Sequence, residues 1–187
     1  MTSEFRQTPS QTVGPFFAFA LPFAGGAQLV APEGADAITV HGTVFDGAGD
    51  PVPDALLEWW QPDADGRMPQ RAGSRARQLG HFTGFGRAEV DAGGHYEFAT
   101  ILPGAIAPST VPWALVTVFA RGLLHHLFTR AYLLGADDPI PADPLLDRID
   151  ARRETLIARA DGPSSYRFDV HLQGERETVF LDYRQQR

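Results

Sequence analysis

The side chains of this sequence that could do chemistry are mainly histidines, carboxylates and arginines. The chain has six histidines, and its adjacent pair, His125 and His126, stands at a turn that leads into a predicted strand. Neighbouring residues of a strand point to opposite faces of a sheet, so they seldom bind one metal ion together. The pair therefore favours a surface or packing role over a metal site.

The carboxylates lie mostly in turn sequences. They include Asp46, Asp50, Asp63, Asp65, Asp137 and Asp138. An aspartate at a turn hydrogen-bonds its own backbone, so we interpret these residues as turn formers. The sequence has no phosphate-binding glycine loop, no G-x-S-x-G elbow and no H-E-x-x-H helix. The common catalytic motifs are therefore missing.

One arginine, Arg121, is predicted to follow the end of a strand, so that its side chain would lie at the rim of the sheet. Arg121 follows Phe119 and Ala120 at the end of a strongly apolar run. A guanidinium at a rim can meet an anion, because its planar fork suits carboxylate recognition. An ion pair with a local carboxylate, or a bond to a carbonyl, is the structural alternative. The residues alone leave both interpretations open.

Length, charge and cysteine content limit the class of protein. A chain of 187 residues is typical of one domain with arms. The absence of cysteine excludes disulfides and thiolate metal sites. The net charge of -7, with arginine as the sole basic residue type besides histidine, disfavours nucleic acid as a partner. Without a charged-then-apolar leader or a long apolar run, we expect a soluble, cytoplasmic protein.

Short strand patterns fill the chain after the arm-like first 36 residues. Alternating apolar residues and turn signals predict strands near residues 38–44, 55–60, 95–100, 113–120, 127–133, 166–172 and 178–183. One short helix is predicted from Pro144 to about Ala160, and residues 62–80 are predicted to form a long loop. The loop carries Arg67, Arg71, Arg75 and Arg77. This pattern predicts an all-β fold, a β-sandwich.

The first 36 residues differ from the rest. Repeated prolines and the Gly25-Gly26 pair interrupt any period there, so we predict an extended N-terminal arm over residues 1–36. The β-sandwich domain is then predicted over residues 37–187.

Several motifs, in one order, resemble the intradiol ring-cleaving dioxygenases. They are TPSQTVGPFF at 8–17, ALLEWWQPDADG at 55–66, VFARGLLHHLFTRAYL at 118–133, RRETLIARA at 152–160 and YRFDVHLQGERETVFLDY at 166–183. The resemblance runs from about Thr8 to the C-terminus. Members of this family fold as β-sandwiches with extended arms, so the resemblance implies the fold that the strand patterns predict.

The resemblance also implies that this chain binds no metal and has no catalytic residue of its own. In the catalytic subunit of the family, two tyrosines and two histidines hold a ferric ion. By position, these ligands correspond to Met68, Ile106, Trp113 and Leu115. None of the four can bind ferric iron as phenolate or imidazole. Their apolar side chains suggest a core that is filled where the metal would lie.

A supporting role in a shared active site is what the resemblance leaves for this chain. It implies an alpha-beta hetero-oligomer in which an iron-binding beta subunit carries Fe(III) and cleaves protocatechuate with O2 to beta-carboxy-cis,cis-muconate. The arm and the strand-end arginine of this chain would complete the pocket. The predicted substrate-binding residues are therefore Thr12, Gly14, Pro15 and Arg121.

Two functions from other classes compete with this interpretation. A transthyretin-like β-sandwich binding module without enzymatic activity explains the strands and the missing ligands, but not the arm that matches the family. An independent metal hydrolase that uses His125, His126 or the turn carboxylates lacks any spaced motif.

Overall fold

The computed structural model describes residues 12, 14, 16–69, 82–107, 109 and 111–182, and these residues form a mostly β structure. The strands are β1 (Ala37–Phe45), β2 (Leu56–Trp60), β3 (Phe85–Glu89), β4 (His95–Ile101), β5 (Trp113–Phe119), β6 (Leu127–Leu134), β7 (Ile157–Gly162), β8 (Ser165–Arg167) and β9 (Val170–His171). The helices are α1 (Phe16–Ala20), α2 (Leu146–Ile149) and the 3-10 helix η1 (Asp150–Leu156). Within the described residues, no helix is long and apolar enough to cross a membrane.

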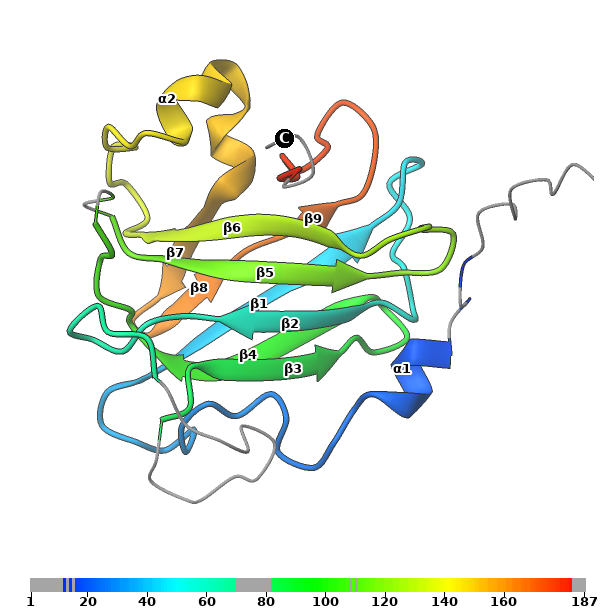
Figure 1. Ribbon diagram of the computed structural model, residues 1–187, viewed down its shortest axis with the longest axis horizontal. Helices are drawn as coiled ribbons and strands as arrows, with labels where there is room; N and C mark the ends of the chain where they lie inside the picture. The colour runs from blue at the N-terminus through cyan, green and yellow to red at the C-terminus, as the bar shows by residue number, and fades with distance from the viewer. Residues whose placement is uncertain are drawn as a thin grey trace, which may run out of the picture.

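The strands form a two-layered sandwich. They are hydrogen-bonded in the order β3-β2-β5-β6-β7-β8-β1-β4, and β9 pairs with β1. Figure 1 shows β3, β2, β5 and β6 in one layer, with β1 and β4 behind them. Fully buried side chains such as Val40, Trp59, Phe98, Val116 and Phe168 fill the space between the layers. The predicted all-β sandwich is confirmed.

A second, smaller core lies outside the sandwich, where β6 and β7 meet the α2–η1 segment. Its buried members include Tyr132, Leu146, Leu156 and Ile157, and Trp113 packs against them from β5. In Figure 1 the α2–η1 segment lies beside β6, close to the end of the described chain. This segment therefore covers one edge of the β5–β6 layer.

The predicted helix between Pro144 and Ala160 is wrong over most of its length. The α-helix has four residues, a 3-10 helix follows it, and Ile157 already begins β7. Tyr132 of β6 pairs with Ile157 in parallel, so backbone pairing to the sheet overrides the local helical pattern.

The predicted strand at 166–172 is interrupted, and the one at 178–183 is not formed in its described part. β1 pairs first with β8 and then with β9, and the backbone of Phe168 crosses over Gly42 between them. A Cβ at Gly42 would lie 2.0 Å from the Phe168 carbonyl oxygen, so this crossing requires glycine. Near the C-terminus, a single bridge joins Leu181 to Phe128. The sequence patterns also missed β3, a short strand with a glycine and an arginine inside it.

The arm contains a short helix, which the prediction of an extended arm over residues 1–36 did not include. α1 begins at Phe16 because Phe17 and Ala18 bury their side chains against Leu56 and Phe119. Further along, the arm enters the seam between β3 and β4. Gly26 O accepts a hydrogen bond from Arg87 N at 2.8 Å, and Ala27 O accepts one from Ala99 N at 3.0 Å. The arm thus bridges the two strands that end the sheet.

Candidate functional site

The arm is held against the end of the β2–β5 pair by an arginine and a small aromatic cluster. Arg87 of β3 donates to Glu58 Oε1 from Nε (3.0 Å) and Nη2 (2.5 Å), and from Nη1 to Leu21 O at 2.9 Å. The rings of Phe17 and Phe119 lie 6.0 Å apart. These contacts place α1 beside the β5–β6 turn, as Figure 1 shows. We call this region, α1 with the preceding arm residues and the β5–β6 turn, the arm end.

The first described arm residues lie at a hollow of the arm end. Thr12 borders a hollow of about 230 Å³ together with Phe119, Ala120 and Leu123. Its hydroxyl accepts a hydrogen bond of 3.3 Å from Gly14 N. Gly14 has a positive φ of 64°, and among the described residues other than its chain neighbours no atom comes within 4 Å of where its Cβ would be. Its backbone is therefore open to approach. Pro15, the remaining predicted arm residue, lies outside the described residues.

Arg121 follows Ala120, which borders this hollow, but does not itself line it, and it is in ion contact with a buried carboxylate. Its Nε is 2.6 Å from Asp54 Oδ2, without the alignment of a hydrogen bond. The Asp54 side chain is 7% exposed and that of Arg121 58%. The local ion pair, the structural alternative from the sequence, is thus present. More than half of the guanidinium side chain still faces solvent.

The arm end also exposes large apolar side chains. Phe16 is 69% exposed, Phe19 80% and Leu124 52%. Apolar patches of this kind on a soluble protein commonly mark contact surfaces. His125 and His126 stand in the same turn, and His126 packs its ring 5.5 Å from Phe119 and 4.7 Å from Phe128. Within the described residues, no group of three or more His, Asp or Glu side chains could hold a metal ion.

The four positions that correspond to metal ligands lie toward the opposite end of β5. Trp113 and Leu115 are half-buried on β5, and Ile106 is half-buried in the loop before it. Met68 is 46% exposed. The backbones of their loops touch, because Gly104 N donates to Asp63 O at 2.8 Å. Sulfur, alkyl and indole groups do not fit a site for ferric iron.

A cavity of about 450 Å³ opens at this end, so the idea of a filled core is wrong here. Ile106 and Trp113 border it, along with Arg130, Asp143 and Leu145. We call this region the cavity end. The sequence patterns did not single out Arg130, although the alternation in β6 places it opposite Leu115, on the same face as Trp113.

A hydrogen-bonded chain runs beneath the cavity. Arg130 Nη1 donates to Tyr132 Oη at 3.2 Å, and Tyr132 Oη donates to Asp143 Oδ1 at 2.9 Å. Burial is the largest influence on Tyr132 and raises its pKa to about 12. Burial also acts to raise the pKa of Asp143, but hydrogen bonds from Ser109, Leu145 N, Tyr132 and Leu146 N outweigh it, and the pKa is lowered. Asp143 is therefore a carboxylate whose charge the protein itself stabilises.

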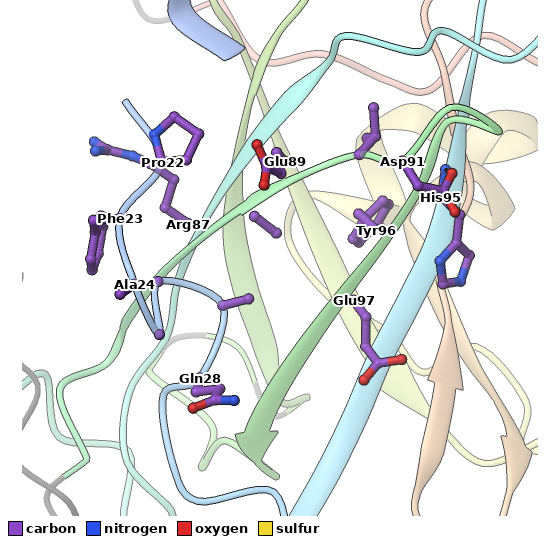
Figure 2. Close-up of a pocket in the computed structure, with 15 residues that line it drawn as sticks. Pro22, Phe23, Ala24, Gln28, Arg87, Glu89, Asp91, His95, Tyr96 and Glu97 are labelled. Carbon is purple, nitrogen blue, oxygen red and sulfur yellow. Dashed lines mark hydrogen bonds between the residues drawn. The ribbon is translucent and has the colours of Figure 1, made fainter. Parts of the chain in front are cut away.

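A further hollow, of about 770 Å³, follows the arm into the seam between β3 and β4 (Figure 2). Figure 2 shows Pro22 and Phe23 of the arm on one side of this hollow and Tyr96 and Glu97 of β4 on the other. Arg87 of β3 lies next to Pro22 and Phe23. None of the predicted site residues borders it. Of the loop arginines, Arg67 pairs with Asp65 at 2.7 Å on the surface, and Arg71, Arg75 and Arg77 lie outside the described residues.

Comparison with known proteins connects this geometry to one family. A family described as Dioxygenase matches residues 27–115. The protocatechuate 3,4-dioxygenase alpha chain of Burkholderia cepacia is 42% identical, over 95% of this chain and 98% of its own length. The beta chain from the same organism is 34% identical, over 75% of this chain and 66% of its own length. Among solved structures, the dioxygenase domain of a carbohydrate-binding fusion protein from Streptomyces sp. SirexAA-E has a TM-score of 0.54 at 25% identity, over 90% of this chain and 99% of that one.

The identity to the alpha chain is higher and extends over nearly the full length of both sequences, whereas the match to the beta chain leaves part of each uncovered. The chain therefore belongs to the intradiol ring-cleaving dioxygenase family, and within it to the protocatechuate 3,4-dioxygenase alpha chains.

Proposed function

We propose that this chain is the non-iron subunit of a protocatechuate 3,4-dioxygenase and that its arm end completes the substrate pocket of an iron-binding beta subunit. The observation that carries the proposal is the composition of the arm end. Thr12 borders the hollow there, Arg121 follows the hollow residue Ala120 with 58% of its side chain exposed, and Phe16, Phe19 and Leu124 of the same region are uncovered. Such an apolar surround is what a second subunit would cover.

The proposed reaction is the intradiol cleavage of protocatechuate by O2 to beta-carboxy-cis,cis-muconate. Fe(III) in the beta subunit would supply the activation of the catechol for reaction with O2. Because Met68, Ile106, Trp113 and Leu115 do not fit a ferric ion, no step of the reaction is assigned to a metal in this chain. We place the alpha-beta complex in the cytoplasm.

The residues of this chain would bind and orient the substrate. Arg121 offers a guanidinium to an anionic group, and Thr12 offers a hydroxyl. Gly14 lets a ring approach the backbone closely, and Pro15 adds a rigid apolar face. In this proposal the arm, residues 1–36, reaches the partner, while the sandwich, residues 37–187, holds the arm and Arg121 in place.

The test is the kinetics of Arg121→Gln in the alpha-beta complex. If Arg121 contacts the substrate, KM for protocatechuate rises about tenfold or more, as the loss of one charge-assisted hydrogen bond predicts. The same substitution leaves buried Asp54 without its ion pair, so a loss of stability is expected as well.

Two further variants separate the two roles of Arg121. Asp54→Asn removes the ion pair but keeps the guanidinium, so KM should stay near the wild-type value. The double variant Asp54→Asn with Arg121→Gln should regain stability while its KM stays high. A normal KM in the stable double variant would show that Arg121 only neutralises Asp54, and would refute its role at the substrate.

A further inference from the structure

The cavity end contains a half-buried guanidinium, that of Arg130, which forms no ion pair with any described residue. The cavity of about 450 Å³ has the size of a small-molecule site and has apolar walls from Ile106, Leu145 and Leu181. Arg130 and Arg148 also border it. The proposed function uses neither arginine, and the cavity lies at the opposite end of β5 from Thr12 and Arg121.

Arg130 is unusual among the strand arginines of the described residues. Arg87, Arg159 and Arg167 each have a carboxylate oxygen within 3.4 Å. Arg130 is half-buried, yet within the described chain it has no ion pair, and its one hydrogen bond goes to the neutral hydroxyl of Tyr132. Its Nε is buried without an acceptor. A half-buried guanidinium normally has an anion beside it.

The indole of Trp113 adds a second unused donor. The Arg130 guanidinium carbon lies 3.9 Å from the centre of the Trp113 ring system, so the two groups are stacked. Trp113 Nε1 is buried and has no acceptor in the described part of the structure. By contrast, Trp59 Nε1 donates to Gln61 Oε1 at 2.6 Å. Arg130 Nε and Trp113 Nε1 are therefore buried N–H groups of two stacked side chains that are left without acceptors among the described residues.

The carboxylates of the same cavity do not meet this need. Asp143 Oδ1 accepts hydrogen bonds from Tyr132 Oη, Leu145 N and Leu146 N, while Asp143 Oδ2 is buried without a hydrogen-bond partner among the described residues. Asp182, at the rim, has a contact of its own. Arg148 is exposed and forms no ion pair with any described residue. Within the described residues of this cavity, the unused donors Arg130 Nε and Trp113 Nε1, with Arg148 at the mouth, thus outnumber the one unused acceptor, Asp143 Oδ2, which favours an anion.

We propose that the cavity binds a small organic carboxylate with an apolar body. The carboxylate accepts hydrogen bonds from Arg130 and, after a small turn of the guanidinium away from the ring, from Trp113 Nε1. Arg148 adds positive charge at the mouth, and Ile106, Leu145 and Leu181 contact the apolar body. The site belongs to this chain alone and does not depend on the role proposed for the arm end.

The indole N–H signals of the full-length chain provide the test. The chain has three tryptophans, so a sample with 15N-labelled tryptophan gives three indole signals, and Trp113→Phe identifies one of them. Titration with benzoate should shift the Trp113 signal in a saturable way. The signals of hydrogen-bonded Trp59 and exposed Trp60 should stay nearly fixed. Benzamide, which has the same body without the charge, should bind at least tenfold more weakly.

Substitutions then test the two donors by calorimetric titration with benzoate. Arg130→Gln and Trp113→Phe should each weaken binding about tenfold, whereas the matched surface variants Arg153→Gln and Trp60→Phe should leave it unchanged. If Arg130→Gln does not fold, Trp113→Phe still decides the matter, because it keeps most of the apolar packing.

The proposal is overturned if the wild-type Trp113 signal does not respond to millimolar benzoate, if benzamide binds equally well, or if Trp113→Phe binds benzoate as tightly as wild type. It is also overturned if benzoate binds only after residues 183–187 are removed, since the cavity would then belong to the chain's own C-terminus.

Discussion

The two ends of β5 differ in what they leave without a partner. At the arm end the charge of Arg121 is paired with Asp54, while Phe16, Phe19 and Leu124 stay exposed. At the cavity end the apolar side chains are covered by the α2–η1 segment, while Arg130 forms no ion pair within the described chain and reaches Asp143 only through Tyr132. One end lacks apolar cover and the other lacks an anion.

This difference indicates different occupants. Exposed phenylalanines on a short helix gain most from a protein surface, since burial of apolar area drives association. A stacked guanidinium in a walled cavity gains most from a planar anion that can approach it closely. A single strand can therefore serve a subunit contact at one end and a small ligand at the other.

The largest expected effect concerns Arg87, which fixes the arm to the sandwich. Arg87→Met removes both contacts to Glu58 and the bond to Leu21 O, and leaves a carboxylate that is only 15% exposed. We expect the free energy of unfolding to fall by about 3–5 kcal/mol, as measured by urea denaturation. The residues of the arm end should then become more mobile than those of the cavity end.

The control for this prediction removes the stranded charge. The double variant Glu58→Leu with Arg87→Met should recover much of the lost stability, because no buried carboxylate is left uncompensated. The surface pair of Arg152 and Glu177, 3.4 Å apart, offers a matched comparison, and Arg152→Met should cost less than about 1 kcal/mol. A similar small loss for Arg87→Met would mean that the arm is held mainly by its backbone bonds to β3 and β4.

Much of the fold follows from local patterns in the sequence. Strands β4, β5 and β6 lie within a residue or two of their predicted bounds, because their alternation or continuous apolar character matches burial on the sheet. The segment after Pro144 could not be predicted in this way, because pairing of Ile157 with Tyr132 joins residues far apart in the chain. The interruption at Phe168 likewise depends on Gly42, which lies in another strand.

The candidate sites show the same limit. The arm residues and Arg121 could be proposed from a family resemblance, and the structure brings Thr12 to the hollow that Ala120, the neighbour of Arg121 in the chain, also borders. The partner of Arg121 could not be read from the sequence, since Asp54 is one of many turn-like aspartates. The pairing of Arg130 with Trp113 depends on the register between β5 and β6, which no local pattern specifies.

A smaller effect is expected where α1 packs on the sheet. Phe17 is buried against Leu56 and Phe119, and Phe19 on the same helix is 80% exposed. Phe17→Ala should lower the free energy of unfolding by about 2–3 kcal/mol, the lower range for removing a buried aromatic side chain, because this cluster is small. Phe19→Ala should change stability by less than about 0.5 kcal/mol but weaken assembly with the beta subunit, as measured by sedimentation. If Phe19→Ala leaves assembly with the beta subunit unchanged, the contact surface for that subunit does not lie at the arm end.

The smallest effect is a pH dependence at the cavity end. Hydrogen bonds to Asp143 lower its pKa below the usual value of 3.8, so the folded chain binds a proton there less readily than the unfolded chain does. Its contribution to stability is therefore fully present above about pH 4 and is lost as the pH falls below that value. Asp143→Asn keeps an oxygen acceptor but not the charge, so the variant should be about 1 kcal/mol less stable at pH 6, and the difference should shrink toward pH 2 in urea unfolding. Asp147→Asn, at an exposed carboxylate of α2, is the matched control and should retain the wild-type pH profile. If Asp143→Asn also keeps that profile, Asp143 does not hold a stabilised charge.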